Sequence, residues 1–391
     1  MCVLLPRVSL MMMSFGENLS GIPDATLSAK PTLILHIGPA KTGTSSIQCS
    51  FQSQTGEEML AKYNYVYLGK FQKNLCGPGS DNERFYKYAH IFGVVLYLKN
   101  KYDGVSLDIS KKSVSHLISL LQHAKYENKN VIISAEELVL LSRARQASWD
   151  GLISIFSDFD VRVIVFHRPY FEWLLSNYHF YNRFEKKNVP WPERLRSFDE
   201  YMKEEKDALS YTSPMNAYKV FEEQFPGKVK VFEMQGNGLV SRFLCSLPSA
   251  SESCSDAEID DALKRAKVNG SGYRFEHNRI IGWAFWKNLV TSCTSYESMT
   301  DALDSYVKEE NTSLSNLPHK CLDDSLAGVI WQETIGQRRY LYGRDATIEE
   351  ELKKKFYVFV NEGRFCNLDL ESVMSEPLKQ RFRLVSDRSC R

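Results

Sequence analysis

The sequence lacks an excess of either charge, closely paired cysteines and internal repeats. Its 49 lysines and arginines nearly balance 48 aspartates and glutamates, which excludes a protein that binds nucleic acid through bulk positive charge. None of its nine cysteines forms a C-x-x-C pair of the kind that marks zinc or redox sites. Any site for a polyanion must therefore be a local patch on an ordinary globular protein.

A long apolar run is also missing from the N-terminus. The apolar residues there fall in two short pieces separated by Pro6 and Arg7, well short of the roughly 18 residues that span a bilayer. We predict that residues 1–30 form a disordered tail without a membrane span. The protein is then expected to be soluble and cytoplasmic, with the Golgi lumen as the alternative if the N-terminus is mis-assigned.

The cysteines are scattered and odd in number, and we expect mainly reduced or buried thiols. Pairing among the six cysteines from Cys245 onward is the alternative, because a secreted or luminal chain with one leftover thiol has the same count. N-x-S/T sequons occur often by chance, and they are present at Asn18, Asn269 and Asn311.

Short apolar runs alternate with helix-like stretches between residues 31 and 245. Unbroken runs of this length are typical of buried parallel strands, and parallel neighbours need crossover helices between them. The sequence therefore predicts a three-layer α/β domain of the P-loop NTPase-like class over residues 31–245. The expected strands are Leu33–Ile37, Val131–Ser134, Val161–Phe166 and Val229–Phe232.

Beyond Pro248 the sequence becomes polar and rich in serine, which is typical of a linker. Apolar residues then recur at helical spacing in Leu326–Tyr342 and again in Ile348–Phe359. We expect residues 246–391 to be a linker and a helical extension packed on the same domain.

The stretch LILHIGPAKTGTSSIQ places a buried strand before a glycine-containing turn and a helix. Glycines at Gly38 and Gly43 let the backbone amides turn inward, the helix start is positive, and Lys41 adds a full charge. This arrangement predicts a phosphate-binding loop. It does not match the nucleoside-triphosphate motif G-x-x-x-x-G-K-[ST], because Lys41 comes before Thr42-Gly43-Thr44, so that the second glycine follows the lysine and does not precede it.

A second segment, VRVIVFHRPYFEWLLSNYHFY, places Arg168 at the end of a strand and Pro169 at the start of a helix. Ser176 follows two turns along that helix. An arginine fork and a hydroxyl near a helix N-terminus suit a phosphate dianion.

Together these segments resemble the sulfotransferases that use 3′-phosphoadenosine 5′-phosphosulfate (PAPS). The first has the form G-x-x-K-T-G-T-[ST] of their 5′-phosphosulfate loop, and the resemblance implies that Lys41 lies near the bridging oxygen. It implies further that Arg168 and Ser176 bind the 3′-phosphate, and that no metal is required. The implied PAPS-binding residues are Gly38, Lys41, Thr42, Gly43, Thr44, Ser45, Ser46, Arg168 and Ser176.

A hydroxyl acceptor also needs a base, and Glu136 is the favoured candidate. It follows the strand NVIIS, and open α/β sheets bind ligands at the carboxyl ends of their strands. Glu137 is a rival that could equally cap the next helix. His36 and His167 are further rivals, and either could instead be a core histidine.

The acceptor is expected to be a glycan or a small hydroxylated molecule, with no nucleic-acid partner. The R-K-G triplet of cytosolic small-molecule sulfotransferases is absent, which favours a relative of the carbohydrate and bacterial-type enzymes. A basic and aromatic span could contact an anionic sugar or could be a solvated loop; it contains Phe184, Lys186, Lys187, Trp191, Arg194 and Arg196.

Two other functions stay open at this point. The strand VIISAE can be read as ending in an acid beside a metal, which would fit an ATP-dependent kinase or NTPase that needs magnesium. A sulfotransferase homologue that binds nucleotide or glycan without catalysis would show the same motifs, because fold does not fix function.

Overall fold

The structure is a computed structural model that describes residues 30–69, 90–103, 108–181, 196–234, 238–248, 250 and 275–389. Pro31–Arg391 form one compact unit and Met1–Lys30 another. The predicted tail therefore lies outside the described residues, apart from Lys30. Within the described ranges, no helix is long and apolar enough to cross a bilayer.

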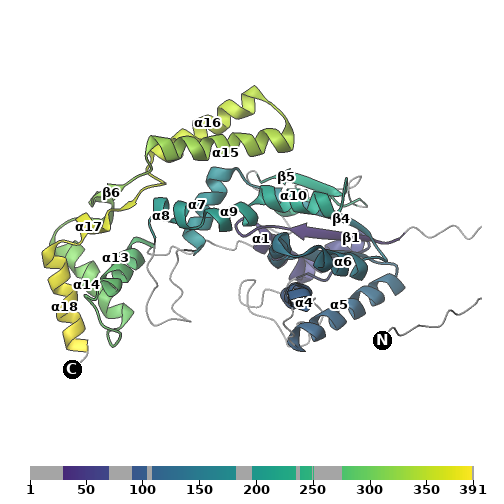
Figure 1. Cartoon of the computed structure of the whole chain (residues 1–391), viewed down its shortest axis with the longest axis horizontal. Coiled ribbons are helices and arrows are strands. Elements are labelled where there is room, and N and C mark those ends of the chain that lie inside the picture. The colour runs from purple at the N-terminus through teal and green to yellow at the C-terminus, as the bar shows by residue number, and fades with distance from the viewer. Residues whose placement is uncertain are drawn as a thin grey trace, which may run out of the picture. The chain divides into compact units, whose positions relative to one another are not determined.

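A parallel sheet of five strands forms the centre of the fold, in the order β2-β3-β1-β4-β5 (Figure 1). Its strands are β1 (Thr32–Ile37), β2 (Tyr65–Tyr67), β3 (Asn130–Ser134), β4 (Asp160–His167) and β5 (Val229–Glu233). The four predicted strands are confirmed. β2 was not predicted, because three residues are too few to give a periodic signal.

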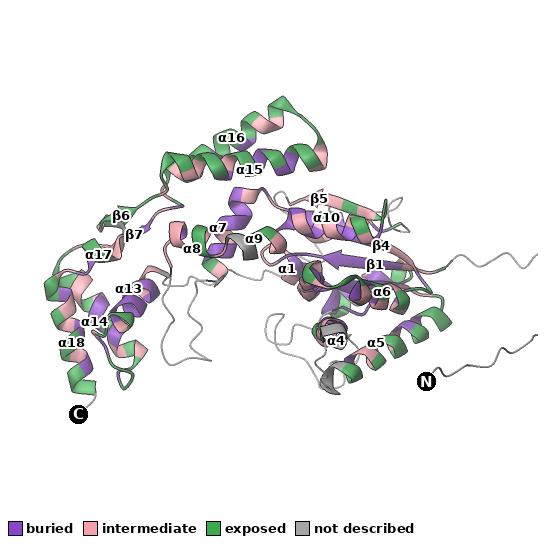
Figure 2. Cartoon of the chain, in the orientation of Figure 1, coloured by how far each residue is buried: buried purple, intermediate pink, exposed green. Residues whose placement is uncertain are grey.

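Alternate residues of the strands pack against helices on opposite faces of the sheet. Leu35 of β1 belongs to the core on one face and Ile34 to the core on the other, and both are buried. Figure 2 shows β1 as buried, as expected for a strand covered on both faces. The predicted three-layer P-loop-like α/β fold is therefore present.

Helices pack on both faces of the sheet through their apolar residues. The helices in the core that contains Leu35, the first core, are α4 (Ile91–Asp103), α5 (Asp108–Tyr126), the 3₁₀ segment η1 (Glu136–Arg143), α6 (Gln146–Ile155) and α10 (Pro214–Gln224). The second core contains α1 (Thr44–Gln52), α2 (Gln54–Lys62) and α11 (Leu239–Cys245).

The remaining helices form two further apolar clusters. One joins α7 (Tyr170–Tyr181), α8 (Phe198–Glu204) and α9 (Lys206–Thr212) to α15 (Asp324–Tyr342) and α16 (Ala346–Asn361). The other joins α13 (Phe275–Trp286), α14 (Tyr296–Glu309), α17 (Leu370–Val373) and α18 (Glu376–Ser389). α15 and α16 confirm the helices predicted from Leu326 and from Ile348. The short antiparallel pair β6 (His319–Lys320) and β7 (Asn367–Leu368) was not predicted.

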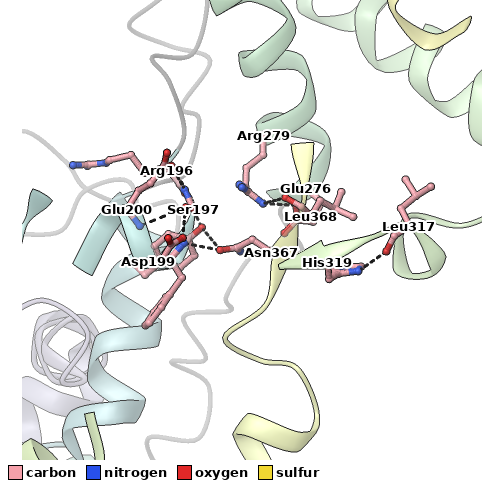
Figure 3. Close-up of polar contacts among 12 residues, drawn as sticks. Arg196, Ser197, Asp199, Glu200, Glu276, Arg279, Leu317, His319, Asn367 and Leu368 are labelled. Carbon is pink, nitrogen blue, oxygen red and sulfur yellow. Dashed lines mark hydrogen bonds and ion pairs between the residues drawn. The ribbon is translucent and has the colours of Figure 1, made fainter. Parts of the chain in front are cut away.

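Asn367 of β7 ties the C-terminal segment to the helix pair α7 and α8. Its Oδ1 accepts hydrogen bonds from the Tyr178 hydroxyl at 3.0 Å and from the Phe198 backbone N–H at 2.7 Å. The next residue, Leu368, accepts at its carbonyl oxygen from the buried guanidinium of Arg279 (Figure 3). Because these buried polar groups need partners, they fix where β7 lies against α7 and α8.

The cysteines differ from the sequence expectation. Cys321 and Cys366 form a disulfide with a sequence separation of 45 residues, and Cys49, Cys245 and Cys293 are disulfide-bonded as well. The expectation of mainly reduced or buried thiols is therefore wrong for these five cysteines, whereas the alternative, pairing among the cysteines from Cys245 onward, is confirmed for Cys321 and Cys366. Spacing alone gave no signal, because partners that meet only in the folded chain need not be close in sequence.

We predict that the Cys321→Ala/Cys366→Ala double variant unfolds at lower urea concentration than the wild-type protein. The disulfide closes a loop of 45 residues, which corresponds to about 4 kcal/mol of lost unfolded-state entropy in the chain-entropy treatment. Cys321→Ser/Cys366→Ser should lose as much, since the cross-link and not the packing is removed. A loss below about 1 kcal/mol in both variants would contradict this.

Candidate functional site

The turn between β1 and α1 is closed by its own threonines. The Thr42 hydroxyl donates to the Pro39 carbonyl oxygen at 2.7 Å, and the Thr44 hydroxyl donates to the Gly38 carbonyl oxygen at 3.2 Å. Both hydroxyls are buried. These bonds occupy the Gly38 and Pro39 carbonyl oxygens within the turn itself.

Glycine is required at both ends of this turn. A Cβ on Gly38 would lie 2.1 Å from the Thr44 hydroxyl oxygen, and a Cβ on Gly43 would lie 2.2 Å from a methyl carbon of Leu239. Gly43 also has φ 82, and Lys41 takes the left-handed region with φ 72. A non-glycine residue in that region is uncommon, so the turn holds Lys41 in a conformation that most sequences avoid.

One face of α7 covers the turn. Trp173 donates its indole N–H to the Ala40 carbonyl oxygen at 3.1 Å, and the Lys41 ammonium lies 5.2 Å from the ring centroid of Phe180. Ser176 lies between these residues in sequence, at the spacing that places side chains on one helix face. The structure thus brings Lys41 and the face of α7 that carries Ser176 together.

Arg168 stands where β4 ends, and β4 is the neighbour of β1 in the sheet. Its Nε donates to a carboxylate oxygen of Glu172 at 3.4 Å, and the other oxygen of that carboxylate lies 2.7 Å from the Lys355 ammonium of α16. Glu172 is nearly buried, whereas about a quarter of the Arg168 side chain is exposed. Two cations therefore share one anion here, which leaves positive charge for a ligand.

The carboxyl end of β3 meets the same edge of the sheet. The register pairs His36 of β1 with Ser134 of β3, and the His36 Nδ1 and the Ser134 hydroxyl are hydrogen-bonded at 2.8 Å. Gln48 of α1 donates to the Ser134 carbonyl oxygen at 3.2 Å. Glu136 begins η1 two residues further on, so it lies at the edge where the predicted loop lies.

Several buried polar atoms near the end of β4 lack hydrogen-bond partners among the described residues. They are both ring nitrogens of His167, the Gln337 Oε1, the Arg338 Nε and the Tyr342 hydroxyl. Tyr342 packs on the His167 ring with centroids 5.8 Å apart. Buried polar groups are usually satisfied, so a bound polar molecule or ordered water at this point would complete them.

A cavity of about 500 Å³ lies between α7, α8 to α10 and α15. Gln337 lines it together with Tyr170, Lys219 and Glu333. Burial raises the pKa of Tyr170 to about 12, and the nearby Glu333 carboxylate adds to the increase, so this hydroxyl is a hydrogen-bond donor at neutral pH. A volume of this size is in the range of small-molecule sites.

The predicted residues fall into two groups in the structure. The loop residues, Ser176, Arg168 and Glu136 gather along one edge of the sheet. From the predicted basic span only Arg196 is described, and it pairs with Glu205. Among the described residues, no three His, Cys, Asp or Glu side chains gather as a metal site would require.

Sequence reasoning missed the residues that support this edge from elsewhere in the chain. Trp173 was visible only as part of an aromatic cluster, and Lys355 and Arg338 come from helices far along the sequence. No sequence motif marks these residues, and their contacts with this edge of the sheet form only in the folded chain.

Comparisons with known proteins add little to this geometry. No protein-family model matches the chain, and no curated protein matches it significantly. A structure from the PezAT chromosomal toxin-antitoxin system of Streptococcus pneumoniae is similar, and the alignment covers 61% of this chain and 86% of the other chain. The identity is 12% and the TM-score 0.25, which is too low to carry an argument. The fold assignment rests on the strand order and the strand-turn-helix at Gly38.

We predict that the protein loses stability as the pH falls from about 6.5 to about 4. Burial lowers the pKa of His36 to about 3. It lowers the pKa of His167 to about 4, with Gln337 opposing the decrease and Arg338 adding to it. The unfolded chain takes up protons near pH 6.5, so in this window it binds more protons than the folded chain, and acid favours unfolding.

Urea unfolding at several pH values measures this effect. His36→Gln should reduce the dependence of unfolding free energy on pH by about one proton, or about 1.4 kcal/mol per pH unit. His123→Gln is the matched control, because the His123 side chain is 69% exposed. A His36→Gln slope equal to that of the wild type would contradict a neutral buried ring.

Proposed function

We propose that this protein is a sulfotransferase that moves a sulfuryl group from PAPS to a hydroxyl or amine of a carbohydrate acceptor. The observation that carries the proposal is the presence of two cationic side chains, Lys41 and Arg168, at one edge of the sheet. One cation stands in the turn after β1 and the other at the end of the neighbouring strand β4. A nucleotide with phosphate groups on both its 5′ and 3′ sides needs two such sites at one edge of a sheet.

In the proposed reaction the acceptor oxygen attacks sulfur in line with the bridging oxygen of PAPS. A new sulfur–oxygen bond forms, the bond from sulfur to the bridging oxygen breaks, and 3′-phosphoadenosine 5′-phosphate leaves. Lys41 and the backbone amides of the loop stabilise the negative charge on the leaving oxygen. Glu136 takes the acceptor proton. Positioning and electrostatics then supply most of the rate enhancement, as in phosphoryl transfer.

Arg168 and Ser176 hold the 3′-phosphate in this proposal. Ser176 is partly exposed on the face of α7 that covers the loop. His167, directly before Arg168 in the chain, interacts electrostatically with Arg338 of α15. The Arg338 Nη1 donates to the Gly343 carbonyl oxygen, whereas its buried Nε has no hydrogen-bond partner among the described residues. An anion at this point would give the Nε a partner.

An ATP-dependent kinase or NTPase is the second candidate. It is favoured by Glu136, since an acid just after the strand beside the loop can hold a metal through water. The Thr42 hydroxyl counts against it. In nucleoside-triphosphate loops the hydroxyl that follows the lysine binds magnesium, whereas Thr42, which follows Lys41, donates its hydroxyl to the Pro39 carbonyl oxygen inside the turn.

The first test is a thermal-shift titration with 3′-phosphoadenosine 5′-phosphate beside ATP, with and without magnesium. Ligand at 100 times Kd stabilises the fold by about 2.7 kcal/mol, which raises Tm by a few degrees. We expect this shift with the 3′-phosphorylated nucleotide and none in the Arg168→Ala variant. Glu172 keeps Lys355 as a partner in that variant, so the fold should persist.

Arg162→Ala is the matched control, because Arg162 is exposed near the start of β4 and pairs with Asp160. It should retain the full shift. A magnesium-dependent shift with ATP alone would reject the sulfotransferase proposal in favour of the kinase.

A second test concerns Lys41. We predict that Lys41→Ala lowers kcat for sulfuryl transfer by about 100-fold or more while nucleotide binding weakens much less, because the charge acts on the leaving oxygen. Steady-state kinetics with labelled PAPS and direct binding of the product nucleotide measure the two effects separately. Lys62→Ala, at the exposed end of α2, should change neither. Equal losses in kcat and in binding would refute the assignment of Lys41 to the leaving group.

A further inference from the structure

The end of α14 is a surface turn built around Asn311. The Asn311 N–H donates to the Lys308 carbonyl oxygen at 3.2 Å, and the Thr312 N–H donates to the Val307 carbonyl oxygen at 3.1 Å. This pair of bonds is the Schellman motif, which satisfies carbonyl groups at a helix C-terminus. The residue at its centre must be left-handed, and Asn311 has φ 47. Asparagine tolerates that conformation better than most residues.

The side chain of Asn311 has no structural task among the described residues. It is exposed, as are Lys308, Glu309 and Glu310 before it, and its carboxamide makes no hydrogen bond within the described ranges. The helix end is held instead by the Schellman bonds and by an ion pair between Glu309 and Arg381 of α18. A bulky polar group on Asn311 would therefore displace nothing from the fold.

Asn311-Thr312-Ser313 is an N-x-S sequon, the acceptor sequence for N-linked glycans. Sequons are common by chance, so the sequence alone supports no site. The disulfides supply an independent reason. Cys321–Cys366 and the bonded Cys49, Cys245 and Cys293 indicate a chain that folds in an oxidising compartment, where glycan transfer to sequons takes place.

We propose that Asn311 is an acceptor for an N-linked glycan, added while the chain enters an oxidising secretory lumen. The donor class is an oligosaccharide on a polyprenyl diphosphate. The amide nitrogen of Asn311 forms a bond to the anomeric carbon of the first sugar, and the bond from that carbon to the diphosphate oxygen breaks. The diphosphate keeps the electron pair, and one amide proton is released. This proposal does not depend on the sulfotransferase assignment, because no nucleotide-site residue takes part.

The direct test expresses the full chain behind a cleavable secretory leader in a eukaryotic cell. Peptide-N-glycosidase treatment in heavy-oxygen water converts a glycosylated asparagine to a labelled aspartate, which mass spectrometry of the peptides locates. We expect the label at position 311 and a faster gel mobility after treatment. An unlabelled Asn311 in the secreted protein overturns the proposal, whether or not Asn18 or Asn269 carries a glycan.

Two variants separate the sequon from the turn. Ser313→Ala removes the sequon hydroxyl but leaves Asn311 in the Schellman motif, and Asn311→Gly removes the acceptor but keeps a residue that favours positive φ. Both should lose the label at position 311, and Ser313→Thr should keep it. Retention of the glycan by Ser313→Ala would show that the sequon is not what directs it.

The Cys321–Cys366 disulfide can be tested separately. Peptide mapping of the same secreted protein without reductant should recover the peptides of Cys321 and Cys366 as one disulfide-linked pair. Glycan transfer precedes complete folding, so glycopeptides from whole-cell lysate test Asn311 even where a variant is retained in the cell. Recovery of both cysteines as free thiols would overturn the compartment on which the proposal rests.

Discussion

The parallel pairing of β1 with β3 on one side and β4 on the other determines where every candidate residue lies. Because the three strands run in the same direction, their carboxyl ends meet at one edge of the sheet. The turn at Gly38, the acid Glu136 and the cation Arg168 each follow one of these ends.

Among the described residues, the helix α7 contacts this sheet edge. Trp173 of α7 donates to the Ala40 carbonyl oxygen, and its side chain also belongs to the apolar cluster with α15 and α16. The same helix therefore contacts the turn after β1 and the C-terminal helices. Asn367 extends this connection, since it accepts from Tyr178 of α7. The position of Ser176 over the loop thus depends on packing contributed by the last third of the chain.

The central strands and the strand-turn-helix at Gly38 could be predicted because their signals are local. An apolar run, a glycine and a lysine at fixed spacing predict the local structure within a few residues. β2 was not predicted because Tyr65–Tyr67 is too short to give a signal. The partner of Cys321 was not predicted because the two cysteines meet only in the folded chain. η1 was expected as an ordinary helix, but the segment after Glu136 is a 3₁₀ helix. The role of Lys355 was not predicted for the same reason, since its partner Glu172 is distant in sequence.

Under the proposed function, the shared carboxylate of Glu172 would let Arg168 serve both the ligand-free fold and the nucleotide. A nearly buried carboxylate without a cation partner would be costly in either state. Glu172 lies between Arg168 and Lys355, so when Arg168 turns toward a phosphate dianion the carboxylate still has the ammonium of Lys355. The long Arg168 to Glu172 contact of 3.4 Å against 2.7 Å for Lys355 fits that division, because the weaker bond is the one that a ligand must replace. Under the proposed function, Lys355 is the residue that lets Arg168 exchange its internal partner for a nucleotide without leaving a buried charge behind.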